Sequence, residues 1–181
     1  GGTALSGHYL NSDTKGAYLD FLLHYKPEFI RGYPSLVSEI ASHALERNVY
    51  LGCKGVELSS ESHSDHQVEL IESVVGPVFD QYGHAEASIF GYSLESRGLI
   101  FCSPMYGLVE ILDDAGDQVG PGGTGEVVVT GFHNYAMPFI RYRTGDLAVL
   151  EGEVDGIVRL RTVIGRTQDY LLSGDGVRHL I

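Results

Sequence analysis

The spacing of apolar residues changes once along the chain, near Ile89, and this change constrains the fold more than any other feature. Before it, apolar residues recur every three or four positions in helix-length segments, which alternate with short β-branched and aromatic runs. After it, apolar and polar residues alternate in short segments bounded by Gly, Pro and Asp. The first half therefore predicts helices between parallel strands, and the second half predicts an antiparallel sheet or small barrel.

Three segments of the first half have the pattern of a helix. The first covers residues 14–25, the second follows the turn at 32–35, and the third ends at Gly76. Side chains that can accept hydrogen bonds from free backbone amides precede the first and the third helix. The predicted caps are Ser12 or Asp13 for the first helix, and Ser62 or Ser64 for the third.

Short strands are expected between and after these helices. They cover residues 29–31, 49–51 and 78–79 in the first half, and 89–92, 99–102, 109–112, 126–130, 147–150, 157–160 and 170–172 in the second. We therefore predict an α/β chain: a mainly parallel sheet with flanking helices over residues 1–93, then a small antiparallel β-barrel or sheet over residues 94–181. The apolar run 177–181 has the pattern of a strand that has just begun, which predicts that more chain follows in the parent protein.

Composition narrows the classes of partner. The 181 residues carry a formal net charge of −12, which argues against a nucleic-acid surface and against an anionic membrane, but leaves room for a small anionic ligand. No apolar run reaches the roughly 20 residues of a membrane span. The two cysteines, Cys53 and Cys102, are too few for a disulfide framework, so we predict that both are reduced and that the protein is cytoplasmic. The oligomeric state stays open.

The stretch Thr144-Gly145-Asp146 joins two apolar runs and presents a carboxylate at a strand edge. Gly145 allows the backbone to turn sharply. The Asp146 carboxylate can then accept hydrogen bonds from two neighbouring hydroxyls, as a sugar diol would offer them. The alternative interpretation is a β-turn with a capping aspartate.

A second polar constellation follows the last strand of the first half, where ligands bind in open α/β sheets. Tyr82 offers a flat ring, Gly83 lets a ligand approach the backbone, and Glu86 offers the hard oxygen ligand that Mg²⁺ prefers. The alternatives are a core tyrosine and a solvated loop charge. A third candidate is Arg166, which follows Gly165 at a strand end and could contact a phosphate or a ribose; the alternative is a surface arginine paired with Asp169.

Three motifs follow one another along the chain: Tyr82-Gly83-His84-Ala85-Glu86, then Tyr142-Arg143-Thr144-Gly145-Asp146, then Gly165-Arg166-Thr167-Gln168-Asp169. Motifs of this kind in this order resemble those of the adenylate-forming enzyme superfamily. The resemblance is strongest to its phenylacetate–CoA ligase branch, with the CapK-like proteins of capsular polysaccharide biosynthesis. The segments 26–35 and 136–143 resemble the same branch. The resemblance spans nearly the whole chain.

This resemblance implies a function and a set of roles. A carboxylic acid would attack the α-phosphate of ATP to give an acyl-adenylate, and a thiol such as coenzyme A would then take the acyl group. Tyr82 would lie against adenine, Asp146 would bind the ribose hydroxyls, Arg166 would bind ribose or phosphate, and Glu86 would hold Mg²⁺. The backbone of Gly55, Val56 and Glu57 would line the adenine pocket, Tyr33, His84 and Ala85 would border the acyl pocket, and Gln168 would occupy the hinge position.

The chain also departs from the superfamily pattern. The early glycine- and serine-rich phosphate loop and the C-terminal lid with its lysine have no match, and Leu58 stands where proline is usual. We therefore expect the 181 residues to be a portion of such an enzyme that binds nucleotide weakly and does not catalyse adenylation alone. The alternatives are a non-catalytic nucleotide-binding or scaffolding module, and a transferase that uses a ready-made acyl-adenylate. The sequence does not identify the acid.

Overall fold

A computed structural model describes residues 2–166, 170–172 and 178–180. The chain divides into two compact units, Gly1–Phe79 and Asp80–Ile181, each described by itself below. The division comes earlier in the chain than the boundary at 93/94 that we predicted from the sequence. Within the described ranges, no helix has the length and apolar character needed to cross a membrane.

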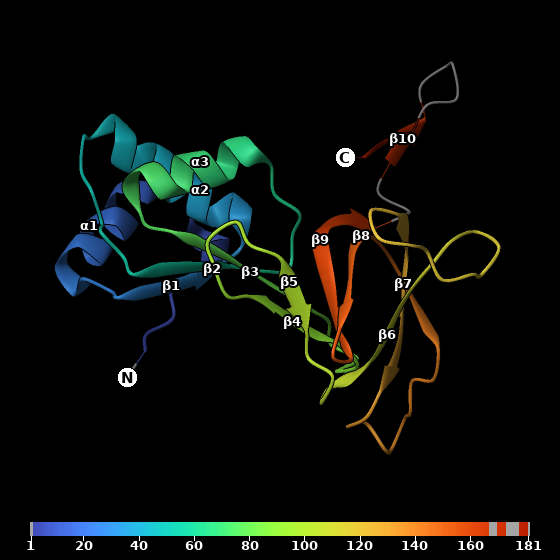
Figure 1. Cartoon of the computed structure of the whole chain (residues 1–181). Helices are drawn as coiled ribbons and strands as arrows, with labels where there is room; N and C mark the ends of the chain where they lie inside the picture. Colours follow the sequence, from blue (N-terminus) through green and yellow to red (C-terminus); the bar gives the residue numbers. More distant parts are fainter. Residues whose placement is uncertain (1, 167–169, 173–177, 181) are drawn as a thin grey trace. The chain divides into compact units, whose positions relative to one another are not determined.

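The first unit has the helix–strand alternation that the sequence predicts. After a short 3₁₀ turn, η1 (Gly7–Tyr9), come α1 (Lys15–Tyr25), β1 (Phe29–Gly32), α2 (Pro34–Glu46), β2 (Gly55–Leu58) and α3 (Asp65–Val74). The strands β1 and β2 pair in parallel, with Ile30 opposite Val56. The helices lie on one side of these strands (Figure 1). The predicted parallel arrangement with flanking helices is therefore confirmed.

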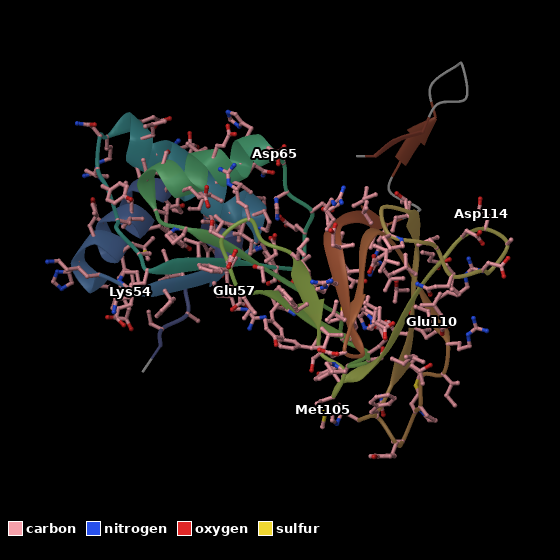
Figure 2. All side chains as sticks on the ribbon, in the orientation of Figure 1. Lys54, Glu57, Asp65, Met105, Glu110 and Asp114 are labelled. Carbon is pink, nitrogen blue, oxygen red and sulfur yellow. The ribbon has the colours of Figure 1, made fainter. Side chains whose placement is uncertain are left out.

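The opposite side of β1 and β2 carries charged side chains beside the exposed ring of Phe29. Successive side chains of a strand point to opposite faces, so Arg31 and Glu57 point away from the helices that cover Ile30 and Val56. Arg31 and Glu57 form an ion pair of 3.2 Å, and Lys54 pairs with Glu28 at 2.7 Å. Lys54 and Glu57 are labelled in Figure 2. This alternation fixes which face of each strand is packed against the helices.

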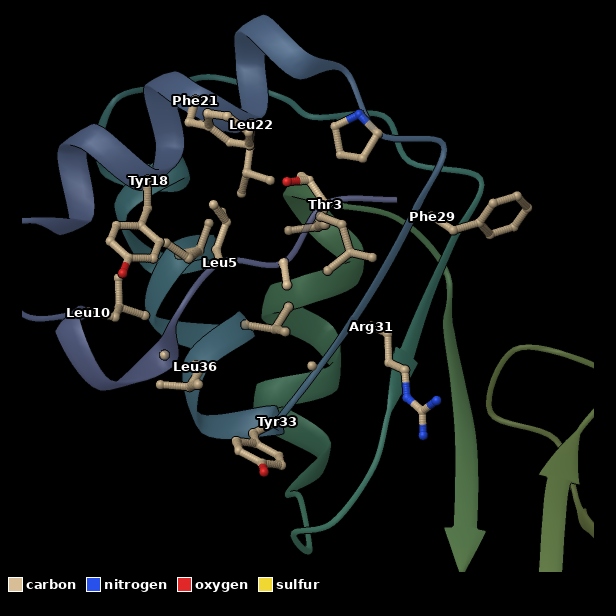
Figure 3. A pocket seen from close by; sticks show the side chains of 18 of the residues that line it. Thr3, Leu5, Leu10, Tyr18, Phe21, Leu22, Phe29, Arg31, Tyr33 and Leu36 are labelled. Carbon is tan, nitrogen blue, oxygen red and sulfur yellow. The ribbon is translucent and has the colours of Figure 1, made fainter. Parts of the chain in front are cut away.

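An apolar cavity of about 1170 Å³ opens in the same unit. Figure 3 shows its lining, which includes Tyr18 and Leu22 of α1, Leu5 of the preceding segment and Phe29 of β1. Tyr33, which we expected to border an acyl pocket, also lines this cavity and is 48% exposed.

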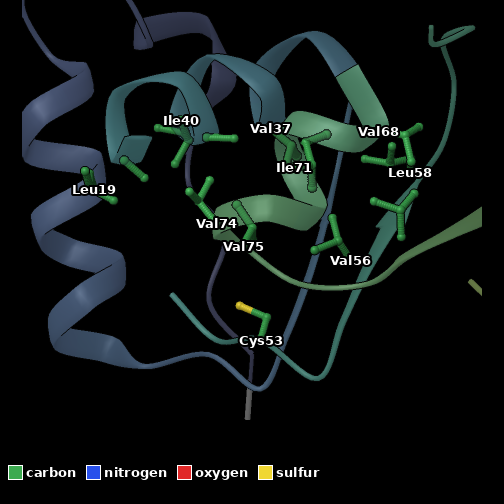
Figure 4. Packing of buried hydrophobic residues seen from close by; sticks show 13 residues of the cluster. Leu19, Val37, Ile40, Cys53, Val56, Leu58, Val68, Ile71, Val74 and Val75 are labelled. Atoms are coloured by element: carbon green, nitrogen blue, oxygen red, sulfur yellow. The ribbon is translucent and has the colours of Figure 1, made fainter. Parts of the chain in front are cut away.

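The core of the first unit is built from one face of each helix and the inner face of β2 (Figure 4). Its fully buried members include Leu19 of α1, Ala41 of α2, Val56 of β2 and Ile71 of α3. On α2 the buried residues include Val37, Ile40, Ala41 and Ala44, whereas Leu45 is exposed. These buried residues recur at the helical spacing that the sequence analysis describes.

Two predictions for this unit are wrong and one is confirmed. Neither Ser12 nor Asp13 caps α1, because the helix begins at Lys15 and Thr14 occupies the cap position, without a side-chain cap hydrogen bond. Ser64 does cap α3, in a reciprocal capping box with Gln67. Residues 49–51 are not a strand, because their amides bond to the carboxyl ends of α2 and α3: Val49 N to Ala44 O and Leu51 N to Val74 O.

The second unit is an antiparallel sheet. Its strands lie in the order β3, β4, β5, β9, β8, β7, β6. Their bounds are β3 (Val78–Gly83, which begins in the first unit), β4 (Phe90–Ser93), β5 (Ile100–Cys102), β6 (Gly107–Leu112), β7 (Thr124–Gly131), β8 (Tyr142–Val154) and β9 (Ile157–Arg166). A separate antiparallel pair joins β10 (Tyr170–Leu172) and β11 (Arg178–Leu180). The predicted antiparallel half is confirmed, and β8 and β9 are longer than predicted.

The inner face of this sheet forms a second core. Ile111, Val127, Val129, Ala148 and Leu160 are fully buried in it, and Tyr82 and Tyr142 pack against its edge. In β7, Val127 and Val129 face this core, and Val128 between them is buried outside it. This core holds β3, β7, β8 and β9 together, and these strands carry the candidate site.

Candidate functional site

A bulge in β8 positions Asp146. In the pairing of β7 with β8, Glu126 lies opposite Leu147 but Val128 lies opposite Arg143, so β8 has extra residues between the paired positions. The backbone of Gly145 has a φ of +78°, which favours glycine. The alternative interpretation of Thr144-Gly145-Asp146, a β-turn with a capping aspartate, is wrong, because the three residues lie inside one continuous strand.

Side chains hold this bulge in shape. The Thr144 hydroxyl donates to the carbonyl of Val127 at 2.9 Å and accepts from the amide of Asp146 at 3.1 Å. The amide of Gly145 donates to the Glu126 carboxylate at 3.2 Å. The Thr144 hydroxyl therefore joins the backbone of β7 to the backbone of Asp146, and this fixes the position of the aspartate on the sheet.

We expect Gly145→Ala to lower the free energy of unfolding by roughly 1–2 kcal/mol, because a Cβ is disfavoured in the left-handed region. Gly120→Ala is the matched control, because an added Cβ there meets no atom within 4 Å and the residue lacks a left-handed φ. Urea unfolding followed by circular dichroism measures both variants. Equal midpoints for the two would contradict the proposed role of the bulge.

Tyr82 lies beside Asp146. The phenol of Tyr82, on β3, donates a hydrogen bond of 2.7 Å to Asp146 Oδ2, and the aspartate side chain is only 15% exposed. Burial and then the neighbouring carboxylate raise the pKa of Tyr82, so the phenol remains a donor at neutral pH. The tyrosine is half-buried against the second core, as the alternative interpretation expected, and it also contacts the predicted ligand-binding aspartate.

Arg166 completes this group. It lies opposite Asp146 in the pairing of β8 with β9, and its Nε is 3.7 Å from Asp146 Oδ1. Its side chain is 68% exposed, so most of the guanidinium can reach a ligand. The alternative partner, Asp169, and the predicted hinge residue, Gln168, lie outside the described residues. Three residues that are far apart in the sequence, Tyr82, Asp146 and Arg166, therefore meet at one place in the second unit.

A second carboxylate group lies on the same unit. Glu86 follows β3, and Tyr142, at the start of β8, donates a hydrogen bond of 3.3 Å to its Oε1. The Nδ1 of His84 is 3.0 Å from Glu86 Oε2, but without the angle of a hydrogen bond. Both ring nitrogens of His84 are buried and have no hydrogen-bond partner among the residues that the structure describes. Sequence reasoning gave Tyr142 no role, although the tyrosine belongs to the same motif as Asp146.

The charges of this group follow from its surroundings. A hydrogen bond from its own backbone amide is the main cause that lowers the pKa of Glu86, and the glutamate is therefore ionised at neutral pH. Burial lowers the pKa of His84, although the Glu86 carboxylate opposes this change. The same carboxylate is the main cause that raises the pKa of Tyr142, which keeps the phenol protonated.

Glu86 fits Mg²⁺ only as a single protein ligand. Across the described ranges, no three or more His, Cys, Asp or Glu residues gather closely enough to hold a metal ion. Mg²⁺ usually keeps several waters and is bound by one or two carboxylates together with substrate phosphates. One ionised glutamate, 33% exposed, is compatible with this mode of binding and not with an all-protein metal cage.

The remaining predicted residues have mixed outcomes. Gly83 and Ala85 are exposed at and after the end of β3. Gly55, Val56 and Glu57 belong to the first unit, where all three lie within β2. The Val56 side chain is fully buried, and its amide donates to the carbonyl of Pro77. Their contact with a nucleotide stays a prediction.

Solved structures define the class of fold. The chain matches a 2-hydroxyisobutyryl-CoA ligase in its postadenylation state with R3-HIB-AMP, with a TM-score of 0.77 and 23% identity over 94% of this chain and 39% of that one. It also matches Mycobacterium smegmatis MbtA, with a TM-score of 0.65 and 17% identity over 93% of this chain and 34% of that one. These likenesses show that the chain has the fold of a part of these two proteins.

Two curated proteins are similar to the chain in sequence. It is 25% identical over 177 residues to protein CapK of Staphylococcus aureus, and 29% identical over 164 residues to the phenylacetate-coenzyme A ligase of Thermus thermophilus. It covers 38% and 36% of these two proteins, respectively. No family model matches it. The resemblance to the phenylacetate–CoA ligase and CapK-like branch, which the three motifs predicted, is thus confirmed.

Proposed function

We propose that the protein activates a carboxylic acid with ATP as an acyl-adenylate and passes the acyl group to a thiol such as coenzyme A. The observation that carries this proposal is the meeting of Tyr82, Asp146 and Arg166 in the second unit. Similarity supports it, because one matched ligase structure was solved with 2-HIB-AMP and CoA. The chain covers well under half of the proteins it matches, so the activity is proposed for the full-length protein.

The nucleotide would be held by three kinds of contact. The ring of Tyr82 offers an aromatic face for adenine, and its hydroxyl is committed to Asp146. That hydrogen bond orients the Asp146 carboxylate and leaves lone pairs that can accept from the two hydroxyls of a ribose. The exposed guanidinium of Arg166 would bind the ribose or a phosphate.

Catalysis of this kind depends on position and charge. In an adenylation reaction the carboxylate must be held in line with the α-phosphate, and the charge that builds up on phosphorus must be stabilised. Glu86 would hold Mg²⁺, which supplies charge neutralisation at the phosphates when it is bound. No protein nucleophile is required, which agrees with a site made of tyrosines, carboxylates and an arginine.

His84 and Ala85 would border the acyl group of the substrate. The ring nitrogens of His84 lack hydrogen-bond partners within the described residues, and a substrate group that reached them would satisfy this unmet capacity. The free, buried thiols of Cys53 and Cys102 support our proposal that the protein works in the cytoplasm, where thiols stay reduced.

A thermal-shift panel with ATP, Mg²⁺ and candidate acids tests this proposal on the full-length protein. A ligand at one hundred times its Kd stabilises the folded state by about 2.7 kcal/mol, so ATP with Mg²⁺ should raise the melting temperature, and the cognate acid should raise it further. The 181 residues alone should bind nucleotide weakly and show no carboxylate-dependent ATP–pyrophosphate exchange. Nucleotide binding by the full-length protein without exchange for any acid would instead favour a non-catalytic module.

A further inference from the structure

We propose that Tyr142 is a positioning residue that fixes the Glu86 carboxylate for a divalent cation. This inference rests on the proposed function, in which Glu86 holds Mg²⁺, and adds a residue to which the sequence assigned no role. The carrying observation is the hydrogen bond from the Tyr142 hydroxyl to Glu86 Oε1 at 3.3 Å, between residues 56 positions apart in the sequence.

The contacts of Glu86 leave room for a cation. Tyr142 engages Oε1, His84 lies 3.0 Å from Oε2, and the backbone amide of Glu86 also donates to its own carboxylate. A carboxylate has about four lone-pair sites, so these three neighbours leave at least one site for a cation. The glutamate side chain is 33% exposed, so a hydrated ion that is also bound to phosphate can reach it.

Tyr142 is itself held in place by its surroundings. It lies opposite Val129 in the pairing of β7 with β8 and packs against the second core. The ring of Phe139 meets it edge-on, with the centroids 4.9 Å apart. The ring of Tyr142 is already ordered in the folded protein, so little further entropy is lost when its hydroxyl binds Glu86. A side chain fixed in this way can hold its hydrogen-bond partner in one orientation.

The residue before Tyr142 sets the direction in which β8 begins. Arg141 has a left-handed φ of +48°, which is uncommon for a residue with a Cβ. Its amide donates to the Thr130 hydroxyl at 2.9 Å. Its guanidinium contacts both carboxylate oxygens of Glu110, at 3.1 and 3.2 Å. These contacts hold an unfavourable backbone conformation directly next to the tyrosine.

Removing the Tyr142 hydroxyl should weaken cation binding and leave nucleotide binding without the cation unchanged. Glu86 would keep its charge but lose the bond that fixes one oxygen, and loss of such outer contacts typically costs 10–100-fold in metal affinity. We expect Tyr142→Phe to reduce the gain in ATP affinity that Mg²⁺ produces by about tenfold. A purely structural role would lower the affinity for ATP in EDTA as well.

The experiment measures the Kd of ATP by isothermal titration calorimetry, in EDTA and in saturating Mg²⁺, on the full-length protein. The variants are Tyr142→Phe, Glu86→Gln and the double variant, with Tyr135→Phe as the control because Tyr135 is 89% exposed on the loop before β8. Glu86→Gln should remove most of the Mg²⁺ effect, and Tyr142→Phe should add little in that background, since coupled residues are not additive.

The outcomes separate this inference from the function on which it rests. Wild-type protein that fails to bind ATP overturns the proposed function. Wild-type protein with a Mg²⁺ effect that Glu86→Gln leaves intact overturns the role of Glu86. A Mg²⁺ effect that Glu86→Gln removes but Tyr142→Phe leaves at the wild-type size overturns the positioning role of Tyr142 alone.

Discussion

Asp146→Ala is expected to weaken ATP binding by about 100-fold or more. The variant removes the acceptor for two ribose hydroxyls, and hydrogen bonds to a charged group contribute about 1.5–3 kcal/mol each. It also leaves the half-buried hydroxyl of Tyr82 without its acceptor, so we expect a loss of about 1 kcal/mol in the free energy of unfolding as well. The thermal shift with ATP and the unfolding curve without it measure the two effects separately.

Two further variants show whether the effect belongs to the carboxylate. Asp146→Asn keeps an acceptor for Tyr82 but removes the charge, so its stability should stay near that of the wild type while its ATP affinity falls. Asp114→Ala removes an exposed carboxylate from a turn of the same unit, and both stability and ATP affinity should remain unchanged. An Asp146→Ala protein that is folded and keeps the wild-type ATP shift would exclude this residue from the binding site.

Leu160→Ala is expected to lower the free energy of unfolding of the second unit by about 2–5 kcal/mol. Leu160 is fully buried in the second core and lies on β9, which pairs with β8, the strand that carries Asp146. Its truncation leaves a cavity in close-packed surroundings. Leu108→Ala is the matched control, because Leu108 lies on β6 of the same unit with 54% of its surface exposed. We expect the control to change stability by less than about 0.5 kcal/mol.

Urea unfolding of the two variants compares these costs directly. A cost for Leu160→Ala that is no larger than the cost for Leu108→Ala would mean that the buried face of β9 is not part of a packed core. Because the bulge of β8 pairs with β9, a destabilised Leu160→Ala protein should also lose ATP binding at a lower urea concentration than the wild type.

The spacing of apolar residues predicted a helix or strand correctly where the residues at that spacing are also the ones that pack in a core. Leu19, Ile40 and Ile71 lie on helix faces that are buried, as the helical spacing predicted. Val127 and Val129 share the core side of β7, although Val128 between them is buried as well. The spacing failed at residues 49–51, a β-branched and aromatic run whose amides are used by helix ends rather than by a neighbouring strand. Local composition does not reveal such long-range hydrogen bonds.

The sequence predicted which residues form the candidate site, but not the backbone structure that positions them. The motifs indicated Tyr82, Glu86, Asp146 and Arg166, and the structure brings Tyr82, Asp146 and Arg166 together. The bulge that presents Asp146 could not be predicted, because it depends on which residues of β7 pair with β8. The contact of Tyr142 with Glu86 joins the start of β8 to the segment after β3, which a single sequence does not specify.

The most direct test of the central claim is to map AMP onto the 181-residue chain by NMR, because binding at millimolar concentrations is sufficient for such a map. The site predicts that AMP shifts the backbone amide signals of Gly83, Gly145, Asp146 and Arg166, and that Asp146→Ala removes these shifts. AMP that perturbs none of these amides, at concentrations where it binds elsewhere on the chain, would contradict the assignment of this group as the nucleotide site.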